Sequence, residues 1–396
     1  MRILLATAGS RGDIEPFAAL ARRAVVEGHH ARLIAPDSSG ADLSGVDALS
    51  MGVDYTRLIE DQGVSLVAAI RSYSSVVRPI MNAVIVEPAR AALEYRPDVI
   101  VAHPKVLSAP IIAEALGIPN ILVEIVPAMT PTSRFPAAGT TTRNLGVFNK
   151  LTYQAAAASA AMFRTDLDQA ARVLGVSRRS VAPPSATLMP ISPAVLARPS
   201  DWPQTVHLTG PWLTETVSNQ LTDEIASFIA GGQFVYAGFG SMAVGDPAAR
   251  AREVLGGIRD FGARALLATG LGGLKAAPQL LGDDVLVVRS IDHALVLPHA
   301  VAAVHHGGIG TVQSATRAST VSVIVPFIAD QPFWGARVHA RGLGPAPIHQ
   351  RHLSSARIVT SLKDSESYRP AIAGASRSMA DEDGAGAALS VIAGLL

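Results

Sequence analysis

VAAVHHGGIGT, residues 301–311, is the stretch of sequence that decides the fold. Its first four residues are apolar and predict a buried strand, and a helical pattern follows over 311–318. The glycines between them let the backbone approach a ligand, and a helix that begins there directs free N–H groups and its positive dipole end at that ligand. The stretch therefore predicts a phosphate-binding turn, although a tight, capped turn with a packing histidine explains these residues equally well by themselves.

Short apolar runs alternate with longer helical patterns on both sides of this stretch. In the second half, strands are expected over 234–237, 263–268, 285–288 and 323–325, with helices over 248–261 and 332–340. In the first half, strands are expected over 3–6, 32–35, 98–102 and 121–123, with helices over 16–27 and 106–116. Strands that alternate with helices form parallel sheets covered on both faces. The predicted fold is α/β, with two doubly wound, Rossmann-like parallel-sheet domains facing each other across a cleft.

Prolines gather between Val181 and Gln204, where the first alternation stops. We therefore expect an N-terminal domain over 1–205, a linker over 206–218 and a C-terminal domain over 219–380. Residues 381–396 are expected to form a final helix that can pack back on the N-terminal domain.

The composition excludes several classes of function. The chain has 396 residues, with 33 basic and 32 acidic side chains, so no excess positive charge is present to hold a nucleic acid. It has no cysteine, which excludes disulfides and thiol nucleophiles and is typical of a cytoplasmic protein. The first apolar run stops at Ala8, too early for a signal peptide, and no apolar run approaches the roughly 20 residues of a membrane span. We expect a monomer or weak dimer without a membrane span, for which peripheral membrane association stays open.

A carboxylate and an amide, Asp330 and Gln331, follow the strand expected over 323–325. Parallel strands end at the same sheet edge, so both should lie beside the turn at 305–311. Together they suit hydrogen bonding to vicinal hydroxyls, while His306 and Thr311 suit a phosphate. The combination predicts a sugar-diphosphate site. Asp330 can equally be an ordinary helix N-cap.

The first expected strand also ends in a glycine-containing loop, AGSRGDIEP, residues 8–16. Gly9 and Gly12 free its backbone, Arg11 suits a phosphate or carboxylate, and Asp13 stands where the loop meets the helix. Asp13 can be an N-cap or a functional carboxylate. The histidines at 103, 299, 339, 349 and 352 show no metal-ligand spacing and are interpreted as structural.

These motifs resemble a known family. The segment HGGIGT at 306–311, with Pro326, Asp330-Gln331 and Gly342-Leu343-Gly344, resembles the donor signature of inverting nucleotide-sugar glycosyltransferases of the GT-B fold. It departs at 319–321, where Ser-Thr-Val replaces the usual Gly-x-Pro. The loop GSRGDxxP at 9–16 resembles that of bacterial antibiotic glycosyltransferases and sterol glucosyltransferases, and residues 125–136 and 149–153 are similar to the sterol branch.

The resemblance implies an N-terminal acceptor domain, a C-terminal donor domain and Asp13 as the catalytic base, whose basicity we expect burial to raise. It implies donor contacts from Ser10, Arg11, Gly12, Ser241, Arg289, Ser290, Ile291, His306, Gly308, Ile309, Gly310, Thr311, Asp330 and Gln331. An apolar acceptor pocket is expected to include Met81, Met129 and Phe135.

We expect transfer of a hexose from a nucleoside-diphosphate sugar, with no metal and no further cofactor. Gln331 favours UDP-glucose by resemblance, and a dTDP-sugar stays open. The expected acceptor is an apolar natural product such as an antibiotic macrocycle or polycycle, with a sterol or lipid as the alternative. Two alternatives lie outside the transferases: a nucleotide-sugar epimerase, and a non-catalytic partner of a transferase. A dinucleotide oxidoreductase is disfavoured because no Gly-x-Gly-x-x-Gly follows a strand.

Overall fold

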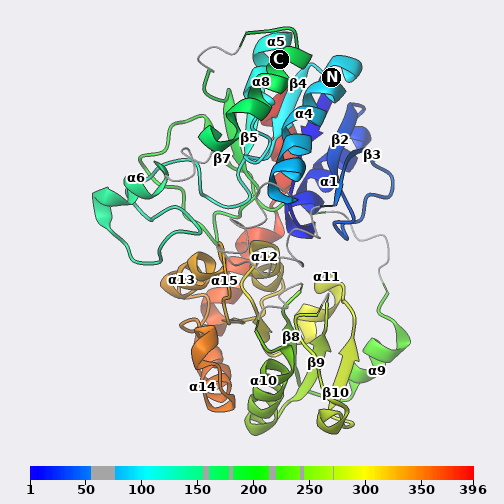
Figure 1. Cartoon of the computed structure of the whole chain (residues 1–396). Coiled ribbons are helices and arrows are strands. Elements are labelled where there is room, and N and C mark those ends of the chain that lie inside the picture. The colour runs from blue at the N-terminus through cyan, green and yellow to red at the C-terminus, as the bar shows by residue number, and fades with distance from the viewer. Residues whose placement is uncertain (55–75, 155–159, 178–181, 214–219, 241–244, 271) are drawn as a thin grey trace.

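The structure is a computed structural model that describes residues 1–54, 76–154, 160–177, 182–213, 220–240, 245–270 and 272–396. Two parallel sheets form its centre, one in each half of the chain (Figure 1). The first has the order β3-β2-β1-β4-β5-β6-β7. Its strands are β1 (Arg2–Ala6), β2 (His30–Asp37), β3 (Asp47–Asp54), β4 (Val99–Ala102), β5 (Asn120–Val123), β6 (Ala186–Met189) and β7 (Val206–Leu208).

The second sheet has the order β10-β9-β8-β11-β12. Its strands are β8 (Phe234–Gly238), β9 (Arg264–Ala268), β10 (Val285–Val288), β11 (Ala303–His305) and β12 (Ser322–Ile324). All strand pairs in both sheets are parallel. The predicted α/β architecture of two doubly wound parallel sheets is therefore confirmed.

Helices cover the first sheet on both faces (Figure 1). These helices are α1 (Arg11–Val26), α4 (Arg78–Tyr95), α5 (Ala109–Leu116) and α8 (Arg164–Val173). The short helix α6 (Asn149–Thr152) and the 3-10 turns η2 (Gly146–Phe148) and η3 (Ala160–Phe163) precede α8 in the segment between β5 and β6. The helix expected over 16–27 begins at Arg11 instead, because Ser10 and Asp13 form a capping box that starts the helix before Pro16. Asp13 therefore lies in the first helical turn.

The helices around the second sheet are α9 (Asp223–Ala230), α10 (Pro247–Phe261), α11 (His293–Val296), α12 (Ile309–Arg317), α13 (Gln331–Ala340), α14 (Ser355–Ser365) and α15 (Arg369–Ala380). Short 3-10 turns η4 (Pro278–Leu280), η5 (Leu297–His299), η6 (Gln350–His352) and η7 (Glu366–Tyr368) lie between them. The last helix of the chain, α16 (Gly384–Ala393), returns to the first half. None of the helices in the described ranges is both long enough and apolar enough to cross a membrane.

Contacts between the two halves are built from buried side chains. Gln313 on α12 is 6% exposed, accepts a hydrogen bond from the Ser192 amide at 2.8 Å and donates to the Pro190 carbonyl at 3.0 Å. The last helix, α16, packs on α1, where Asp383 pairs with Arg23 at 2.6 Å. Strand β7 occupies the first three positions of the segment expected as a linker, and the domain boundaries stay a prediction.

Candidate functional site

The loop with Asp13 and the turn with His306 each follow a strand at which the order of its sheet reverses. In an open parallel sheet a ligand site forms where the strand order reverses. The first sheet reverses between β1 and β4, and the second between β8 and β11. The loop with Asp13 follows β1 and the turn with His306 follows β11. Each predicted motif therefore lies at the reversal point of its own sheet.

Asp13 is held from both sides by polar groups. Its Oδ2 accepts hydrogen bonds from the Ser10 amide at 2.7 Å and the Ser10 hydroxyl at 3.1 Å. On the other side, His103 Nε2 lies 3.4 Å from Oδ1, and Lys105 Nζ lies 3.5 Å from Oδ2. The side chain is 23% exposed, so it keeps an open face. Asp13 is thus not the N-cap, a position that Ser10 takes, but the third helical residue of the capping box, and its role as a functional carboxylate stays a prediction.

The expectation that burial makes Asp13 more basic is wrong for its net pKa. Burial does raise the pKa of Asp13, but the charge of Lys105, the hydrogen bond with His103 and the Ser10 amide lower it more strongly, and the pKa lies well below its usual range. The carboxylate is therefore ionised at every physiological pH. These contacts hold the carboxylate in its ionised form, and its role as the catalytic base stays a prediction.

His103, interpreted from the sequence as structural, is a polar partner of Asp13. It directly follows β4, which pairs with β1 in the sheet. Its Nδ1 accepts the Lys105 amide at 3.2 Å, so in the neutral ring the proton is on Nε2, which faces Asp13. Burial lowers the pKa of His103 against the opposing effect of Asp13. The signal available in the sequence was its place directly after an expected strand.

Gly9 is required by the packing around Asp13. Its φ is +146°, and a Cβ at this position would overlap the Asp13 carboxylate and lie 2.7 Å from Lys105 Nζ. Neither group can move away without breaking the contacts described above. The glycine is therefore part of the arrangement that holds the carboxylate.

We expect Gly9→Ala to lower the free energy of unfolding by about 1–3 kcal/mol, through backbone strain and displacement of Asp13. Urea unfolding followed by circular dichroism measures this. The matched control is Gly374→Ala in α15, where the nearest atom to an added Cβ is 4.0 Å away, and which should be neutral or slightly stabilising. Equal stability of Gly9→Ala and wild type would contradict the assignment.

The turn after β11 has the features predicted for an anion site. Gly307 has a φ of +90°, and Gly308 is the N-cap of α12. An added Cβ on Gly308 would lie 2.7 Å from His306 Nε2, whereas nothing lies within 4 Å of the Cβ position on Gly310. The first N–H groups of α12 have no intrahelical partner and begin beside this open space. The turn can therefore take a phosphate through the amides of 309–311.

His306 is half-buried beside this turn, in its neutral form. Burial lowers its pKa to about 4, against an opposing effect of the Gly238 backbone. Among the described residues its Nδ1 has no hydrogen-bond partner. The nitrogen that faces the turn is Nε2, which an added Cβ on Gly308 would approach to 2.7 Å, and a neutral imidazole can donate one hydrogen bond from this nitrogen to an oxyanion.

Asp330 lies at the N-cap of α13, but its side chain makes no capping bond. Its Oδ2 accepts the Trp334 indole N–H at 2.9 Å. Burial, and to a smaller extent the charge of Asp13, raise the pKa of Asp330 to about 6. The charge of Asp13, from the other half of the chain, thus contributes to the pKa of Asp330.

Gln331 is 5% exposed and binds its own loop. Its Oε1 accepts the amides of Phe327 at 2.8 Å and Ile328 at 3.2 Å. The carbonyl side of this amide is thus occupied, and a contact with a sugar hydroxyl would have to come from its NH2 group. The predicted hydrogen bonding to vicinal sugar hydroxyls would therefore use the NH2 group of Gln331 and the carboxylate of Asp330.

The remaining expected donor contacts lie around these groups. Arg11 pairs with Glu15 at 2.5 Å. Desolvation, and after it the charge of Arg11, lower the pKa of the half-buried His293, in the other half of the chain, to about 4. Ser10 holds Asp13, and Gly12 is in the first turn of α1. Arg289, Ser290 and Ile291 follow β10 at the exposed or partly exposed edge, and Ser241 lies outside the described residues.

A further glycine loop was missed by sequence analysis. Residues 269–270 and 272–273, Thr-Gly and Gly-Gly, come after β9, the neighbour of β8. The Gly273 amide donates to the Gly240 carbonyl at 3.3 Å, and a Cβ on Gly270 would overlap that carbonyl. This loop therefore supports the backbone beside His306, and its glycine content after an expected strand was the available signal.

The expected acceptor residues are placed less favourably. Met81 is partly buried against the core of the first half. Met129 donates its amide to Glu124 Oε2 at 2.8 Å, and Glu124, which sequence analysis missed, is fully buried and also accepts the Ala128 and Thr130 amides. Burial raises the pKa of Glu124 against these hydrogen bonds. Glu124 thus shapes the loop that follows β5.

Phe135 is 2% exposed and lies in the packing between the two halves. Its ring meets Trp202 at 6.0 Å and Phe333 at 5.4 Å between centroids, both edge-on. The structure places Phe135 in this core and leaves it almost no exposed surface for an acceptor. Within the described ranges, no group of three or more His, Asp or Glu side chains is arranged to hold a metal ion, and the metal-free chemistry stays a prediction.

Comparisons with known proteins match both halves of the chain. Residues 3–133 match the glycosyltransferase family 28 N-terminal domain, and residues 259–393 match the erythromycin biosynthesis protein CIII-like C-terminal domain. A sterol 3-beta-glucosyltransferase of Arabidopsis thaliana is 29% identical over 388 residues, covering 92% of this chain and 62% of that protein. The chain spans 24% to 62% of the length of the sterol glucosyltransferases that it matches.

Solved structures agree with the architecture. The glycosyltransferase of kitacinnamycin superposes with a TM-score of 0.74 at 17% identity, covering 100% of this chain and 99% of that chain. The glycosyltransferase VinC, solved in complex with dTDP, superposes with a TM-score of 0.67 at 18% identity, covering 99% of this chain and 100% of that chain. These likenesses show the two-domain GT-B fold, and the two matched domains confirm the resemblance read from the sequence.

Proposed function

We propose that this chain, which joins a glycosyltransferase family 28 N-terminal domain to an erythromycin biosynthesis protein CIII-like C-terminal domain in the GT-B fold, transfers a hexose from a nucleoside-diphosphate sugar to an acceptor hydroxyl. The observation that carries the proposal is the pairing of Asp13, an ionised carboxylate on one half, with an anion-binding turn and Asp330 on the other. The charge of Asp13 contributes to the raised pKa of Asp330, which supports a site that the two halves share.

The reaction follows from this placement. The acceptor O–H loses its proton to the Asp13 carboxylate as its oxygen forms a bond to the anomeric carbon. The bond from that carbon to the diphosphate oxygen breaks, and the nucleoside diphosphate leaves with the electron pair. Attack opposite to the leaving group inverts the anomeric configuration. The departing negative charge is met by the amides of 309–311, the α12 dipole and the His306 N–H.

A carboxylate with a lowered pKa can still serve as this base. It cannot deprotonate an alcohol in the ground state, but the hydroxyl becomes acidic as the C–O bond forms. His103 and Lys105 keep Asp13 ionised and fix its direction, which contributes orientation instead of basicity.

We propose a favoured candidate and a second candidate for the donor and for the acceptor. We favour UDP-glucose on the resemblance at Gln331, with a dTDP-sugar as the alternative that the dTDP complex of VinC supports. For the acceptor we favour an apolar, hydroxylated natural product, in line with the antibiotic-pathway fold neighbours. A sterol or lipid is the second candidate, which the sequence relatives support.

The proposed function is tested by incubating the full chain with a panel of UDP- and dTDP-sugars and hydroxylated natural products or sterols, followed by mass spectrometry. A hexose added to one acceptor class supports transfer and identifies that class. Donor conversion without any acceptor would indicate an epimerase. No product with any donor, although the donors bind, would support a non-catalytic partner. A chelator in the same assay should leave the rate unchanged.

The pKa of Asp330 predicts the acid side of the pH profile. Because its pKa is about 6 and that of Asp13 is well below the usual range, the group that titrates between pH 7 and 5 is Asp330. Its charge-assisted hydrogen bond to the sugar weakens on protonation, so kcat/KM for the donor should fall about tenfold from pH 7 to pH 5.

Stability should not cause this fall. A raised pKa in the folded state means that Asp330 contributes stability below its unfolded value of 3.8, and that this stability is lost as the pH rises through about 6. The folded state therefore gains stability from this group while activity decreases. In the variant Asp330→Asn, the inflection near pH 6 in the pH profile of kcat/KM should disappear. An inflection that persists in this variant would assign it to another group.

A further inference from the structure

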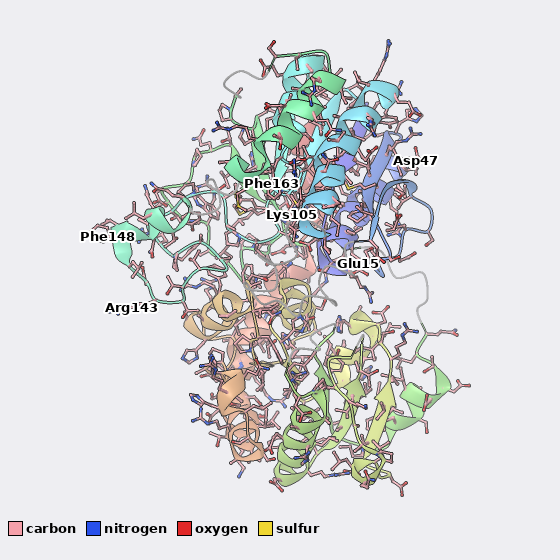
Figure 2. All side chains as sticks on the ribbon, in the orientation of Figure 1. Glu15, Asp47, Lys105, Arg143, Phe148 and Phe163 are labelled. Carbon is pink, nitrogen blue, oxygen red and sulfur yellow. The ribbon has the colours of Figure 1, made fainter. Side chains whose placement is uncertain are left out.

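A lobe of the N-terminal domain extends sideways from both sheets. It consists of residues 139–153 and carries η2 and α6 (Figure 1). Four large apolar side chains on it are exposed, with fractional exposures from 40% to 73%: Leu145, Val147, Phe148 and Leu151. Figure 2 shows Phe148 and Arg143 at the outer edge of the molecule. Exposed apolar side chains gathered on one projecting turn indicate a contact surface.

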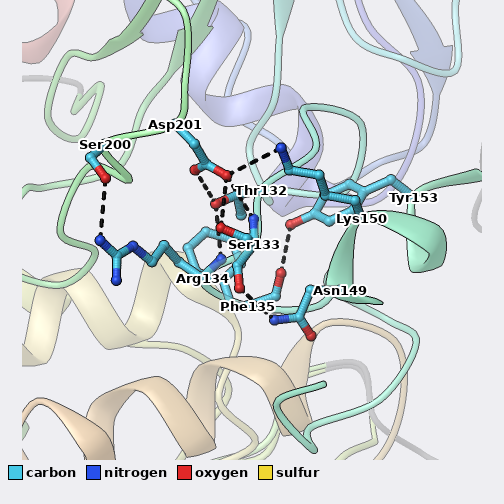
Figure 3. Close-up of polar contacts among 9 residues, drawn as sticks. All are labelled: Thr132, Ser133, Arg134, Phe135, Asn149, Lys150, Tyr153, Ser200 and Asp201. Atoms are coloured by element: carbon cyan, nitrogen blue, oxygen red, sulfur yellow. Dashed lines mark hydrogen bonds and ion pairs between the residues drawn. The ribbon is translucent and has the colours of Figure 1, made fainter. Parts of the chain in front are cut away.

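The lobe is firmly attached to the domain, so this exposure is not that of a loose loop. Asn149 is fully buried and donates to the Ser133 carbonyl at 2.9 Å, and the Tyr153 hydroxyl donates to the Phe135 carbonyl at 3.1 Å (Figure 3). Asp201 accepts hydrogen bonds from the Thr132 hydroxyl at 2.6 Å and the Ser133 amide at 2.8 Å. These buried contacts hold the base of the lobe while its apolar side chains extend from it.

The lobe segment itself carries only basic charge, and the carboxylate of Asp201, from a separate segment, pairs with Lys150. Residues 125–165 contain four basic side chains and no acidic one, in a chain whose basic and acidic residues are otherwise balanced. Arg143 lies on the lobe itself, and Lys150 on α6 is 53% exposed while its Nζ is 3.6 Å from Asp201. Apolar side chains between basic ones match the boundary between the acyl chains and the headgroups of an anionic bilayer.

We propose that this lobe docks the protein on the surface of an anionic lipid bilayer, with Val147 and Phe148 inserted and Arg143 and Lys150 against the lipid headgroups. A second copy of the chain fits less well, because two such lobes would repel each other. A stable dimer also buries about 800 Å² on each partner, more than one short turn offers. Docking brings the loop after β5 close to apolar acceptors dissolved in the bilayer, and this consequence rests on the proposed function.

The test is flotation of the full chain with vesicles of phosphatidylcholine, with and without phosphatidylglycerol, and with no sugar donor present. We expect binding to the anionic vesicles that decreases at high salt. Val147→Ser/Phe148→Ser should reduce the bound fraction about tenfold or more. Arg143→Gln should weaken binding to anionic vesicles while leaving any binding to neutral ones unchanged.

The matched control is Val25→Ser/Val26→Ser at the end of α1, where adjacent valines are 52% and 81% exposed. It should bind as wild type does. Wild-type protein that floats with neither kind of vesicle would overturn the proposal, as would undiminished binding of the lobe variant. A lobe variant that changes only the mass measured by light scattering would assign the surface to a second copy. Because no donor is present, these outcomes are independent of sugar transfer.

Discussion

Replacing Asp13 with Asn is expected to lower turnover by about 10²- to 10⁴-fold, the range typical for loss of a general base. The amide has nearly the same shape and can still accept a hydrogen bond from the Ser10 amide, which the carboxylate accepts at 2.7 Å. It cannot take the acceptor proton. Affinity for the nucleoside diphosphate should stay close to that of wild type, because the phosphate turn lies on the other half of the chain.

Steady-state kinetics together with calorimetry of nucleoside diphosphate binding separate these two effects. Glu15→Gln is the matched control, since it makes the same change of charge two residues further along α1, where Glu15 is 40% exposed and pairs with Arg11. Its turnover should change little. Unchanged turnover in Asp13→Asn would remove Asp13 from the mechanism, whatever the control shows.

Replacing His306 with Ala is expected to weaken nucleoside diphosphate binding by about tenfold to a hundredfold. A hydrogen bond to a charged oxygen contributes about 1.5–3 kcal/mol, and the imidazole donor has no substitute in the described part of the turn. Because burial lowers the pKa of His306 to about 4, the ring is neutral above pH 6. The difference in affinity between wild type and variant should therefore be constant from pH 6 to pH 8.

Isothermal calorimetry at several pH values measures this prediction. His299→Ala is the control, because His299 is exposed and precedes β11, at the opposite edge of the sheet from the phosphate turn. An affinity that His306→Ala leaves unaltered would refute the phosphate contact. A difference that grows as the pH falls toward 6 would indicate a charged imidazolium in place of the neutral donor.

Elements with a strong local signal were predicted well. The apolar run at 301–304 and the glycines after it led correctly to β11 and α12, and the alternation around them led to two parallel sheets. The helix with Asp13 was expected at residue 16 and begins at Arg11, because Pro16 was taken as the first turn. The capping box of Ser10 and Asp13 competes with that signal and starts the helix earlier.

Roles that depend on neighbours distant in sequence were not predictable in this way. His103 lies 90 positions from Asp13 and became its partner because β4 pairs with β1. Phe135 has the apolar character of a pocket residue, but Phe333 and Trp202 enclose it. Gln331 was expected to bind sugar hydroxyls with Asp330, but its side-chain carbonyl accepts the Phe327 and Ile328 amides.

The sequence by itself determined the fold class, the resemblance to GT-B transferases and the candidate residues, because hydrophobic period, glycine position and motif spacing act over a few residues. Only the tertiary structure decided the electrostatics of those residues. The pKa of Asp13 depends on Lys105 and His103, and that of Asp330 on burial and on Asp13 across the chain. Such shifts arise from solvent exclusion and from charges a few ångströms away in space, which the order of residues along the chain does not contain.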